Sequence, residues 1–342
     1  MNKKLVYLII LITFASNIRA QDHSPVSFSA LNLRSSARVA ALGMDFLAWK
    51  TNDIGIGISN PSLIDSNMHN QINIGYTDLF AGIWQGHIAY SRTFNKVGSL
   101  GFGLNYVGYG EFKRTEASGD EFGEFSANDY MFTIAWSKQL EDNLFIGVSL
   151  KPVFSQYESY SSSAIAFDLA ATYTNQRFNM DWTIMARNFG SQIKQFNNIK
   201  EKLPFDLAIG MSKELTHAPF RLFVMANNLH KWDLRENDPL RPRDRLDPFT
   251  GEIKRENNIL SILDNGFRHI ELGVDFHPSK LFYIAFGYSW KQSREMYLDD
   301  ALSLAGISYG FGFNYRRYSF RFARNEYHRF GSPNHIGLSV KL

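Results

Sequence analysis

The sequence predicts an all-β protein: a fourteen-stranded antiparallel transmembrane β-barrel with a short N-terminal plug segment. Three observations lead to this prediction. Large apolar residues alternate with small or polar ones over repeated segments from position 71 onward, which is the pattern of outer-membrane barrels. The connections between these segments alternate between short and long. Phe (29 residues) and Tyr (16 residues), which both favour strands, are unusually frequent.

Composition argues against two other classes of protein. The chain of 342 residues is 44% hydrophobic, yet its mean hydropathy is only −0.24. A helical membrane protein would have a strongly positive value, because each span needs about 20 apolar residues in a row. The net charge of +3 comes from 36 basic and 33 acidic residues, which is too balanced to indicate a nucleic-acid partner. Since the chain has no cysteine, we expect neither a disulfide nor a lipid-modified cysteine.

The N-terminus is typical of a secretory signal peptide. A short basic stretch precedes an apolar run from Leu5 to Phe14, and Ala20 offers a cleavage site. The run is too short to cross a bilayer as a helix, which disfavours a membrane anchor. We therefore expect a signal peptide at 1–20, an N-terminal periplasmic or plug segment at 21–70, and the transmembrane barrel at 71–342.

The stretch SLGFGLNYVGYG, which begins at Ser99, illustrates the alternation. Positions 100, 102, 104 and 106 are large and apolar, and the positions between them carry glycine or asparagine. Fourteen segments of this kind are expected as strands: 71–79, 84–94, 98–109, 128–139, 144–155, 163–175, 178–189, 204–214, 219–229, 267–277, 280–291, 303–314, 316–326 and 334–342.

Charge indicates which face of these strands meets lipid. Ionisable residues recur on the polar face, and a dry core between two soluble sheets would hold them only at high cost. The large apolar residues, such as Phe102, are therefore expected to face lipid. Because both signs of charge line the lumen, mutual neutralisation is favoured over an acid–base pair. The luminal charges expected are Asp129, Asp168, Asp181, Arg187, Asp206, Glu271, Asp275 and Arg321.

The connections predict the orientation of the barrel. They are short after even-numbered strands, as at 95–97, and mostly long after odd-numbered strands, as at 110–127 and 230–266; the short connection 81–83 is the exception. Outer-membrane barrels have short periplasmic turns and long outer loops. We therefore expect a protein of the outer membrane of a Gram-negative bacterium, with both termini in the periplasm.

Residues 21–70 lack the alternation. Ser35 to Ala48 is expected to form a short helix. Asn60-Pro61-Ser62 is expected to be a turn or a helix start, because proline fits a first helical turn. This segment would plug or cap the periplasmic mouth of the barrel.

Five segments resemble a known family of outer-membrane barrels. LNLRSSARVAALGM (31–44) is similar to the entry segment of type IX secretion system barrels, in which a run such as S-A-R-x-x-A-L-G precedes the barrel. SNPSLID (59–65) resembles the N-P-A turn that these barrels share with FadL-like fatty-acid transporters, with Ser62 in place of the alanine. HAPFRLFVMANNLHKWDLR (217–235) is the most specific segment and resembles the signature of the PorQ family. GEFSANDY (123–130) and LPFDLAIGMSKEL (203–215) also resemble that family.

The resemblance implies a FadL-like fourteen-stranded barrel. It also implies a component of the type IX secretion system that anchors a PorZ-like cell-surface partner in the cargo attachment complex, together with PorU-like and PorV-like members. The family provides no catalytic residue to carry over. The expected partners are therefore outer-membrane lipid and these proteins.

The motifs that could indicate catalysis are weak. Gly306 to Gly310 matches the G-x-S-x-G nucleophile elbow, which requires a sharp strand-to-helix turn. The motif lies inside an alternating strand, so Ser308 is expected to be a luminal side chain and no catalytic residue is assigned. The nine histidines lack metal-ligand spacings such as H-E-x-x-H. We therefore expect no metal, no cofactor and no enzymatic activity.

The connection 230–266 is the main candidate for partner contact. Its arginines could bind a partner's acidic surface or lipopolysaccharide phosphates. The alternative is a solvated loop of mixed charge, because acidic residues accompany the arginines. Two aromatic residues could anchor a partner or belong to the interfacial aromatic belt. The candidates for partner contact are Tyr157, Trp232, Arg235, Arg241, Arg243 and Arg245.

The sequence is compatible with three functions. The first is a non-enzymatic docking barrel of the type IX secretion system. The second is a FadL-like transporter of a hydrophobic small molecule, gated by residues 21–70. The third is an outer-membrane lipase or acyltransferase, which the Ser308 motif barely supports. A transporter should have an apolar pocket of about 300–1,000 Å³, whereas a docking barrel needs only a plugged lumen and ordered outer loops.

The predicted orientation can be tested with inserted tags. A tag or protease site near Asp247 should be reachable on intact cells, because the long connection 230–266 is expected outside. The same insertion near Asn143, in a short connection, should be protected. Surface labelling of the two insertion strains measures the difference, and equal accessibility at both positions would contradict the predicted orientation.

Overall fold

The computed structural model describes residues 28–116, 118–197, 199–235, 245–246, 253–254, 258–296, 304–327 and 331–342. The predicted signal peptide at 1–20 lies outside the described residues. No helix of the described residues is long and apolar enough to cross a membrane.

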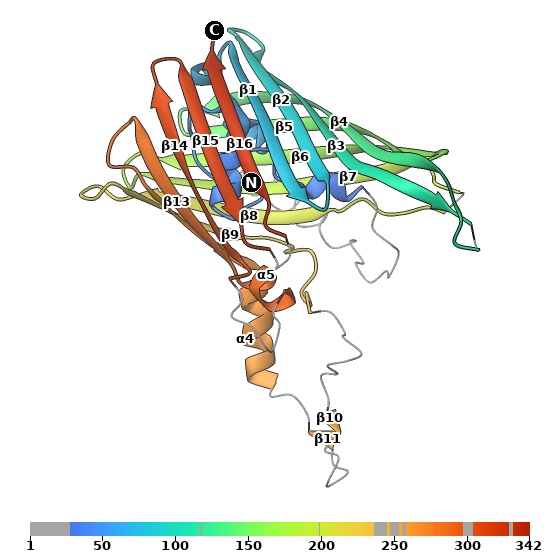
Figure 1. The fold of residues 1–342 in the computed structure, drawn as a ribbon. Helices are drawn as coiled ribbons and strands as arrows, with labels where there is room; N and C mark the ends of the chain where they lie inside the picture. The colour runs from blue at the N-terminus through green and yellow to red at the C-terminus, as the bar shows by residue number, and fades with distance from the viewer. Residues whose placement is uncertain are drawn as a thin grey trace, which may run out of the picture.

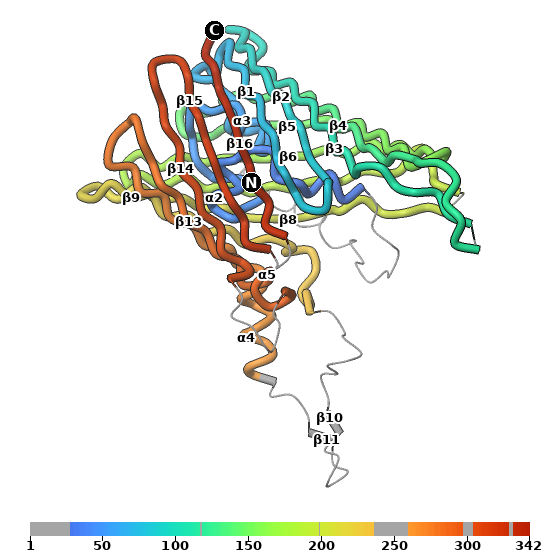
Figure 2. The backbone as a smooth tube through the Cα atoms, viewed as in Figure 1, coloured from blue at the N-terminus to red at the C-terminus, as the bar shows by residue number. Residues whose placement is uncertain are grey.

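Fourteen antiparallel strands close into one barrel (Figures 1 and 2). Each barrel strand pairs with the barrel strands before and after it in the sequence, so that β9 pairs with β12, and β1 pairs with β16 to close the wall, with Gln71 opposite Lys341. The strands are β1 (Gln71–Phe80), β2 (Ile83–Phe94), β3 (Gly98–Thr115), β4 (Glu121–Glu141), β5 (Leu144–Tyr157), β6 (Tyr160–Asn175), β7 (Met180–Lys194), β8 (Asp206–Glu214), β9 (Phe220–Ala226), β12 (Ile270–Phe276), β13 (Phe282–Ser289), β14 (Ile307–Tyr315), β15 (Tyr318–Asn325) and β16 (Asn334–Lys341).

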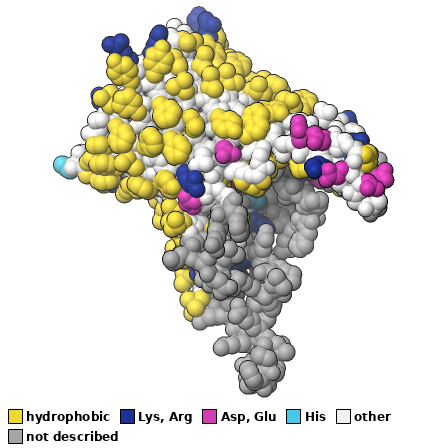
Figure 3. Space-filling view, viewed as in Figure 1, with side chains coloured by type: hydrophobic (Ala, Val, Ile, Leu, Met, Phe, Trp, Pro, Cys, Tyr) yellow, Lys and Arg dark blue, Asp and Glu magenta, His cyan; other side chains and the backbone are white. Residues whose placement is uncertain are grey.

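The outer surface of the barrel wall is apolar. Phe102, Leu272 and Phe286 are 43%, 48% and 50% exposed, whereas their neighbours Ala285 and Glu271 are buried on the inner face. Figure 3 shows hydrophobic side chains covering the wall, with Lys and Arg at its upper rim. An apolar belt around a closed barrel is what a lipid bilayer requires. The predicted fold class, a fourteen-stranded antiparallel transmembrane barrel, is confirmed.

Residues 28–70 lie inside the barrel, as the blue elements of Figure 1 show. They form only short helices, and the expected helix at 35–48 is reduced to five residues. Apolar residues of this plug, among them Leu42, Phe46 and Leu63, are fully buried against the wall. The helices are η1 (Ser29–Asn32), α2 (Ala37–Ala41), α3 (Ile54–Gly57), η2 (Pro61–Leu63) and η3 (Ser66–Met68).

The barrel has two different ends. We call one the turn end, because it carries short connections such as 95–97 and 142–143, and Asn70 and Leu342 lie side by side there through a 2.9 Å backbone hydrogen bond. We call the other the loop end, which carries the connections 195–205, 227–269, 290–306 and 326–333.

Two predicted loops at the loop end are instead strand. The segment 110–127, expected as a loop, continues β3 and β4 into a long hairpin, and β5 and β6 extend into the expected loop 156–162. Phe112 stacks on Phe125 at 5.3 Å, and Lys113 pairs with Glu121 at 2.8 Å. These cross-strand contacts stabilise the hairpin where it extends beyond the roughly 9–11 residues of each strand that span a membrane.

The segment predicted as the long loop 230–266 contains further elements. α4 (Asn258–Arg268) forms the end of this segment and includes residue 267, where a strand was expected to begin. Outside this segment, α5 (Trp290–Glu295) replaces the last residues of the strand expected at 280–291. The two-residue strands β10 (Arg245–Leu246) and β11 (Ile253–Lys254) pair with each other.

The lipid-facing surface can be tested at Phe102. Phe102→Arg should reduce the amount of folded barrel in outer membranes, because a cationic side chain near the middle of the lipid-facing belt costs about 2–4 kcal/mol. Phe102→Leu is the control and should insert normally. Heat-modifiable mobility in gels measures the folded fraction, and equal folding of both variants would show that Phe102 does not face hydrocarbon.

Candidate functional site

The plug is held to the wall by a polar turn at Asn60. The Asn60 side-chain oxygen accepts hydrogen bonds from the Ser62 backbone N–H (3.3 Å) and hydroxyl (2.7 Å), and its amide donates to the Leu47 carbonyl (3.0 Å). The Ser62 hydroxyl lies 2.6 Å from that of Thr172 on β6, which lies 2.6 Å from that of Thr183 on β7. Asn60, the first residue of the predicted turn, is therefore the N-cap of η2. The same turn is hydrogen-bonded to two strands of the wall.

Glycine in the wall lets the plug backbone approach closely. A Cβ atom at Gly147 of β5 would lie 2.3 Å from the Pro61 carbonyl carbon and from the Ser62 nitrogen. A Cβ atom at Gly287 of β13 would lie 2.1 Å from the Leu42 oxygen. Because the obstructing atoms belong to backbone, a side chain at either position would have to displace the plug.

Charges of the plug meet charges of the wall. Arg321 of β15 pairs with Asp53 at 3.0 Å, and Arg187 of β7 pairs with Asp45 at 2.9 Å. The sequence predicted that the luminal charges would neutralise one another. The structure pairs Arg187 with Asp206 of the wall at 3.3 Å, as predicted, and also brings several of the luminal charges to partners on the plug.

Arg38 is a buried charge of the plug. It pairs with Asp275 of β12, and its guanidinium carbon lies 3.6 Å from the ring centroid of Tyr283 and 4.3 Å from that of Trp49. Aromatic faces stabilise a buried cation by about 2 kcal/mol when it is desolvated. Arg38 was not among the predicted luminal charges; the signal for it in the sequence is the S-A-R run at 36–38, of which it is the arginine.

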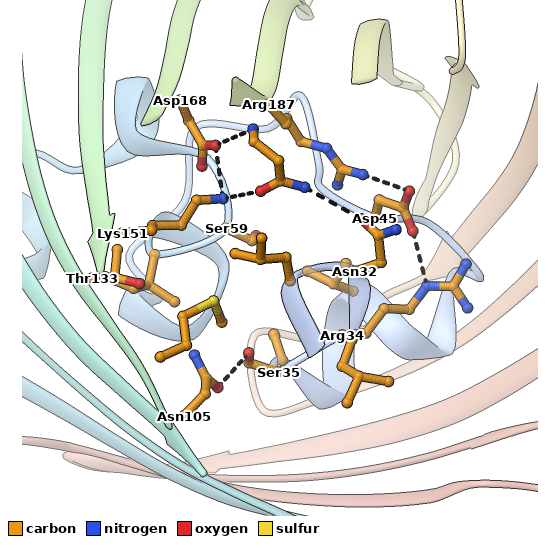
Figure 4. Close-up of a pocket in the computed structure, with 17 residues that line it drawn as sticks. Asn32, Arg34, Ser35, Asp45, Ser59, Asn105, Thr133, Lys151, Asp168 and Arg187 are labelled. Carbon is orange, nitrogen blue, oxygen red and sulfur yellow. Dashed lines mark hydrogen bonds and ion pairs between the residues drawn. The ribbon is translucent and has the colours of Figure 1, made fainter. Parts of the chain in front are cut away.

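A small polar cavity lies between plug and wall (Figure 4). Its volume is about 60 Å³. Lys151 of β5 pairs with Asp168 of β6 at 2.7 Å on one side, and Arg34 lies 3.4 Å from Asp45 on the other. A cavity of this size holds a few water molecules and is well below the 300 Å³ or so of a small-molecule pocket.

Asp45 stands between two arginines at this cavity. Burial alone opposes its ionisation, but Arg187 and Arg34 together hold the pKa of Asp45 below its usual range. The carboxylate therefore remains ionised at neutral pH and bridges wall and plug.

Ser308 is the second residue of β14 and pairs within the sheet, so it does not stand on a strand-to-helix turn. Its hydroxyl accepts a hydrogen bond from the Asn325 amide at 2.7 Å, and a Cβ atom at Gly43 of the plug would lie 3.0 Å from it. Ser308 therefore packs against the plug. Among the described residues, no three His, Asp or Glu side chains are grouped in a way that could hold a metal ion.

Tyr157 points into the barrel at the loop end. Its ring stacks on Phe196 at 5.1 Å, and its hydroxyl donates to Asp129 at 3.3 Å. The Tyr109 hydroxyl donates to the same carboxylate oxygen at 2.7 Å. Tyr157 therefore does not belong to the interfacial aromatic belt, which was one of the two roles expected for it.

Trp232 and Arg235 lie at the base of α4. The Trp232 ring is 64% exposed and stacks on His269 at 5.7 Å. Arg235 lies 3.4 Å from Asp233. The candidates Arg241 and Arg243 lie outside the described residues, and Arg245 lies in β10.

Fold and interior define a class: a transmembrane β-barrel whose lumen is occupied by its own N-terminal segment. No protein-family model matches the chain, and no curated protein matches it. Solved structures do match.

One similar structure is the TodX ΔS2S3 mutant monoaromatic hydrocarbon channel, with a TM-score of 0.54 and 11% identity, covering 92% of this chain and 100% of that chain. The Pseudomonas putida toluene transporter TodX has a TM-score of 0.52 and 11% identity, covering 91% and 98%. The Ralstonia pickettii toluene transporter TbuX has a TM-score of 0.50 and 10% identity, covering 90% and 98%. The FadL-like barrel fold is therefore shown, and at this identity the likeness concerns the fold.

The contact between plug and wall can be tested at Gly147. Gly147→Ala should loosen the plug, because the new Cβ atom meets backbone at 2.3 Å and overpacking of this kind costs about 1–3 kcal/mol. Gly337→Ala on β16 is the matched control, since its Cβ atom would lie 3.7 Å from Ala37 in ordinary contact. Limited proteolysis of the refolded barrels measures cleavage within 28–70. Equal protection in both variants would contradict the close contact at Gly147.

Proposed function

We propose that this chain is a non-enzymatic outer-membrane barrel that retains a surface protein at its loop end. It would act as a PorQ-like component of the type IX secretion system, with a PorZ-like partner and PorU-like and PorV-like members of the attachment complex. The observation that carries the proposal is the occupied lumen, in which ion pairs and backbone contacts fasten the plug to the wall. The resemblance of 217–235 supports it, because this segment runs through β9 to the base of α4.

A second candidate is a FadL-like transporter of a hydrophobic small molecule. The comparisons favour this function over the first, since the similar structures are named as a hydrocarbon channel and toluene transporters. Transport along the barrel axis would require the plug to move, because the plug fills the lumen and is ion-paired with the wall. The polar cavity between plug and wall, of about 60 Å³, is too small to pass such a molecule.

The proposal places the barrel in the outer membrane of a Gram-negative bacterium. The turn end, with Asn70 and Leu342, would face the periplasm, and the loop end would face outward. This orientation rests on the general rule that outer-membrane barrels have short periplasmic turns. Lipopolysaccharide would then surround the loop end.

A disulfide between plug and wall separates the two functions. A Cβ atom at Gly337 would lie 3.7 Å from that of Ala37, which suits a disulfide, and the natural chain has no cysteine. In the A37C/G337C double variant, oxidation should leave a surface protein retained as in wild type, because docking does not move the plug. The surface protein is first identified as the one that appears in the medium when the barrel is deleted. Its retention in each variant is then measured as the fraction that stays bound to cells.

Each single-cysteine variant is the control. If oxidation stops uptake of radiolabelled toluene and a reductant restores the uptake, the transport function is correct. If deletion of the barrel releases no surface protein, the docking function is wrong.

A further inference from the structure

Four exposed arginines at the turn end lie over aromatic rings of the outer wall. In each case the guanidinium carbon is 5.4 or 5.5 Å from the centroid of a Phe or Tyr ring one or two positions away in the sequence. A cation at this distance from an aromatic face is attracted to it. We call these four arginines the turn-end rim: Arg92, Arg177, Arg316 and Arg317.

The turn-end rim lacks carboxylate partners among the described residues. None of its four arginines forms an ion pair with a described Asp or Glu, and Glu214 of the same end already pairs with Arg221. At the loop end, by contrast, Arg324 of the outer wall pairs with Glu326 at 2.8 Å. The charges of the turn-end rim are therefore available to an anion from outside the chain.

The turn between β14 and β15 places two of these charges next to each other. Tyr315 pairs with Tyr318, so Arg316 and Arg317 form a two-residue turn. The φ angle of Arg316 is 54°, in the left-handed region where glycine and asparagine are the usual residues of such a turn. An arginine at this position opposes folding, and strain of this kind is typical of functional positions.

The lengths of β14 and β15 place this turn at the level of the lipid headgroups. The two strands have 9 and 8 residues, and a strand needs about 9–11 residues to cross the hydrocarbon. Tyr318 and Phe320 lie on the same outer face of β15 and are 44% and 41% exposed, so the apolar belt continues to the turn. Because strands this short cannot extend beyond the bilayer, Arg316 and Arg317 lie at its surface.

We propose that the turn-end rim binds the phosphate headgroups of anionic phospholipids in the leaflet around the turn end. Guanidinium groups bind phosphate oxygens through paired, charge-assisted hydrogen bonds. Aromatic rings at the headgroup level anchor membrane proteins in the same layer. Under the proposed orientation this is the periplasmic leaflet. The contact requires neither docking nor transport, so it goes beyond both proposed functions.

Two other occupants fit the turn-end rim less well. A second copy of the chain in the same membrane would bring rims of equal charge together, and like charges at an interface repel each other. An acidic soluble protein would have to enter the headgroup layer to reach Arg316 and Arg317, because the short strands hold them at the bilayer surface.

The test measures lipid binding to the purified, folded barrel in detergent by native mass spectrometry. The R316N/R317G variant should bind phosphatidylglycerol at least ten times more weakly than wild type, because each cation near an anionic surface contributes a factor of about five. Asn-Gly suits a two-residue turn, so this variant should fold. Phosphatidylcholine, which has no net charge, should bind wild type and variant alike.

The matched control is K113Q/R114Q, which removes two positive charges from the loop end. It should bind phosphatidylglycerol as wild type does, and heat-modifiable mobility should show both variants folded. Equal binding of phosphatidylglycerol by folded R316N/R317G and wild type overturns the proposal. An equal loss in K113Q/R114Q also overturns it, because the effect would then come from net charge alone.

A photo-crosslinking residue in place of Tyr318 identifies the occupant in native outer membranes. A crosslink to phospholipid supports the proposal, whereas a crosslink to lipopolysaccharide, to a second copy or to another protein overturns it. Either failure would leave the docking function standing, because docking is assigned to the loop end.

Discussion

A charge inside this barrel needs an opposite charge or hydrogen-bond donors to meet it, and the plug supplies several of the opposite charges. Asp275 meets Arg38, Arg321 meets Asp53, and Arg187 meets Asp45. Removal of one partner of a buried pair costs about 3–5 kcal/mol, because the other charge is left uncompensated. Wall and plug are therefore interdependent: without the plug, the inner face of the wall would carry unpaired charges.

The wall could be predicted from the sequence because its signal is local. Alternation with a period of two fixes the face of each residue, so the number of strands and the lipid-facing positions, Phe102 among them, followed directly. The long hairpin of β3 and β4 was missed because charges and glycines there resemble a loop, while cross-strand pairs such as Phe112–Phe125 extend it.

For the ion pairs inside the barrel, only the partner on the wall could be predicted from the sequence. The wall residues Asp275 and Arg321 were expected in the lumen, but Arg38 and Asp53 lie in a segment without periodicity, and their partners are more than 200 positions away. The close approach of Pro61 to Gly147 depends likewise on tertiary structure. α4 did leave a local signal, the helical spacing of Leu260, Leu263 and Phe267, within a segment that its charges made resemble a loop.

The closure of the wall between β1 and β16 has a consequence for assembly. These are the first and last strands of the barrel, so their pairing has the largest sequence separation in the sheet. Contacts of this kind form late, because the entropy of closing a long loop must be overcome before they contribute. The bond between Arg321 and Asp53 joins the last part of the wall to a segment that precedes the first strand. Asp53, which is synthesised before the first strand, therefore gains its ion pair only after nearly the whole wall has been made.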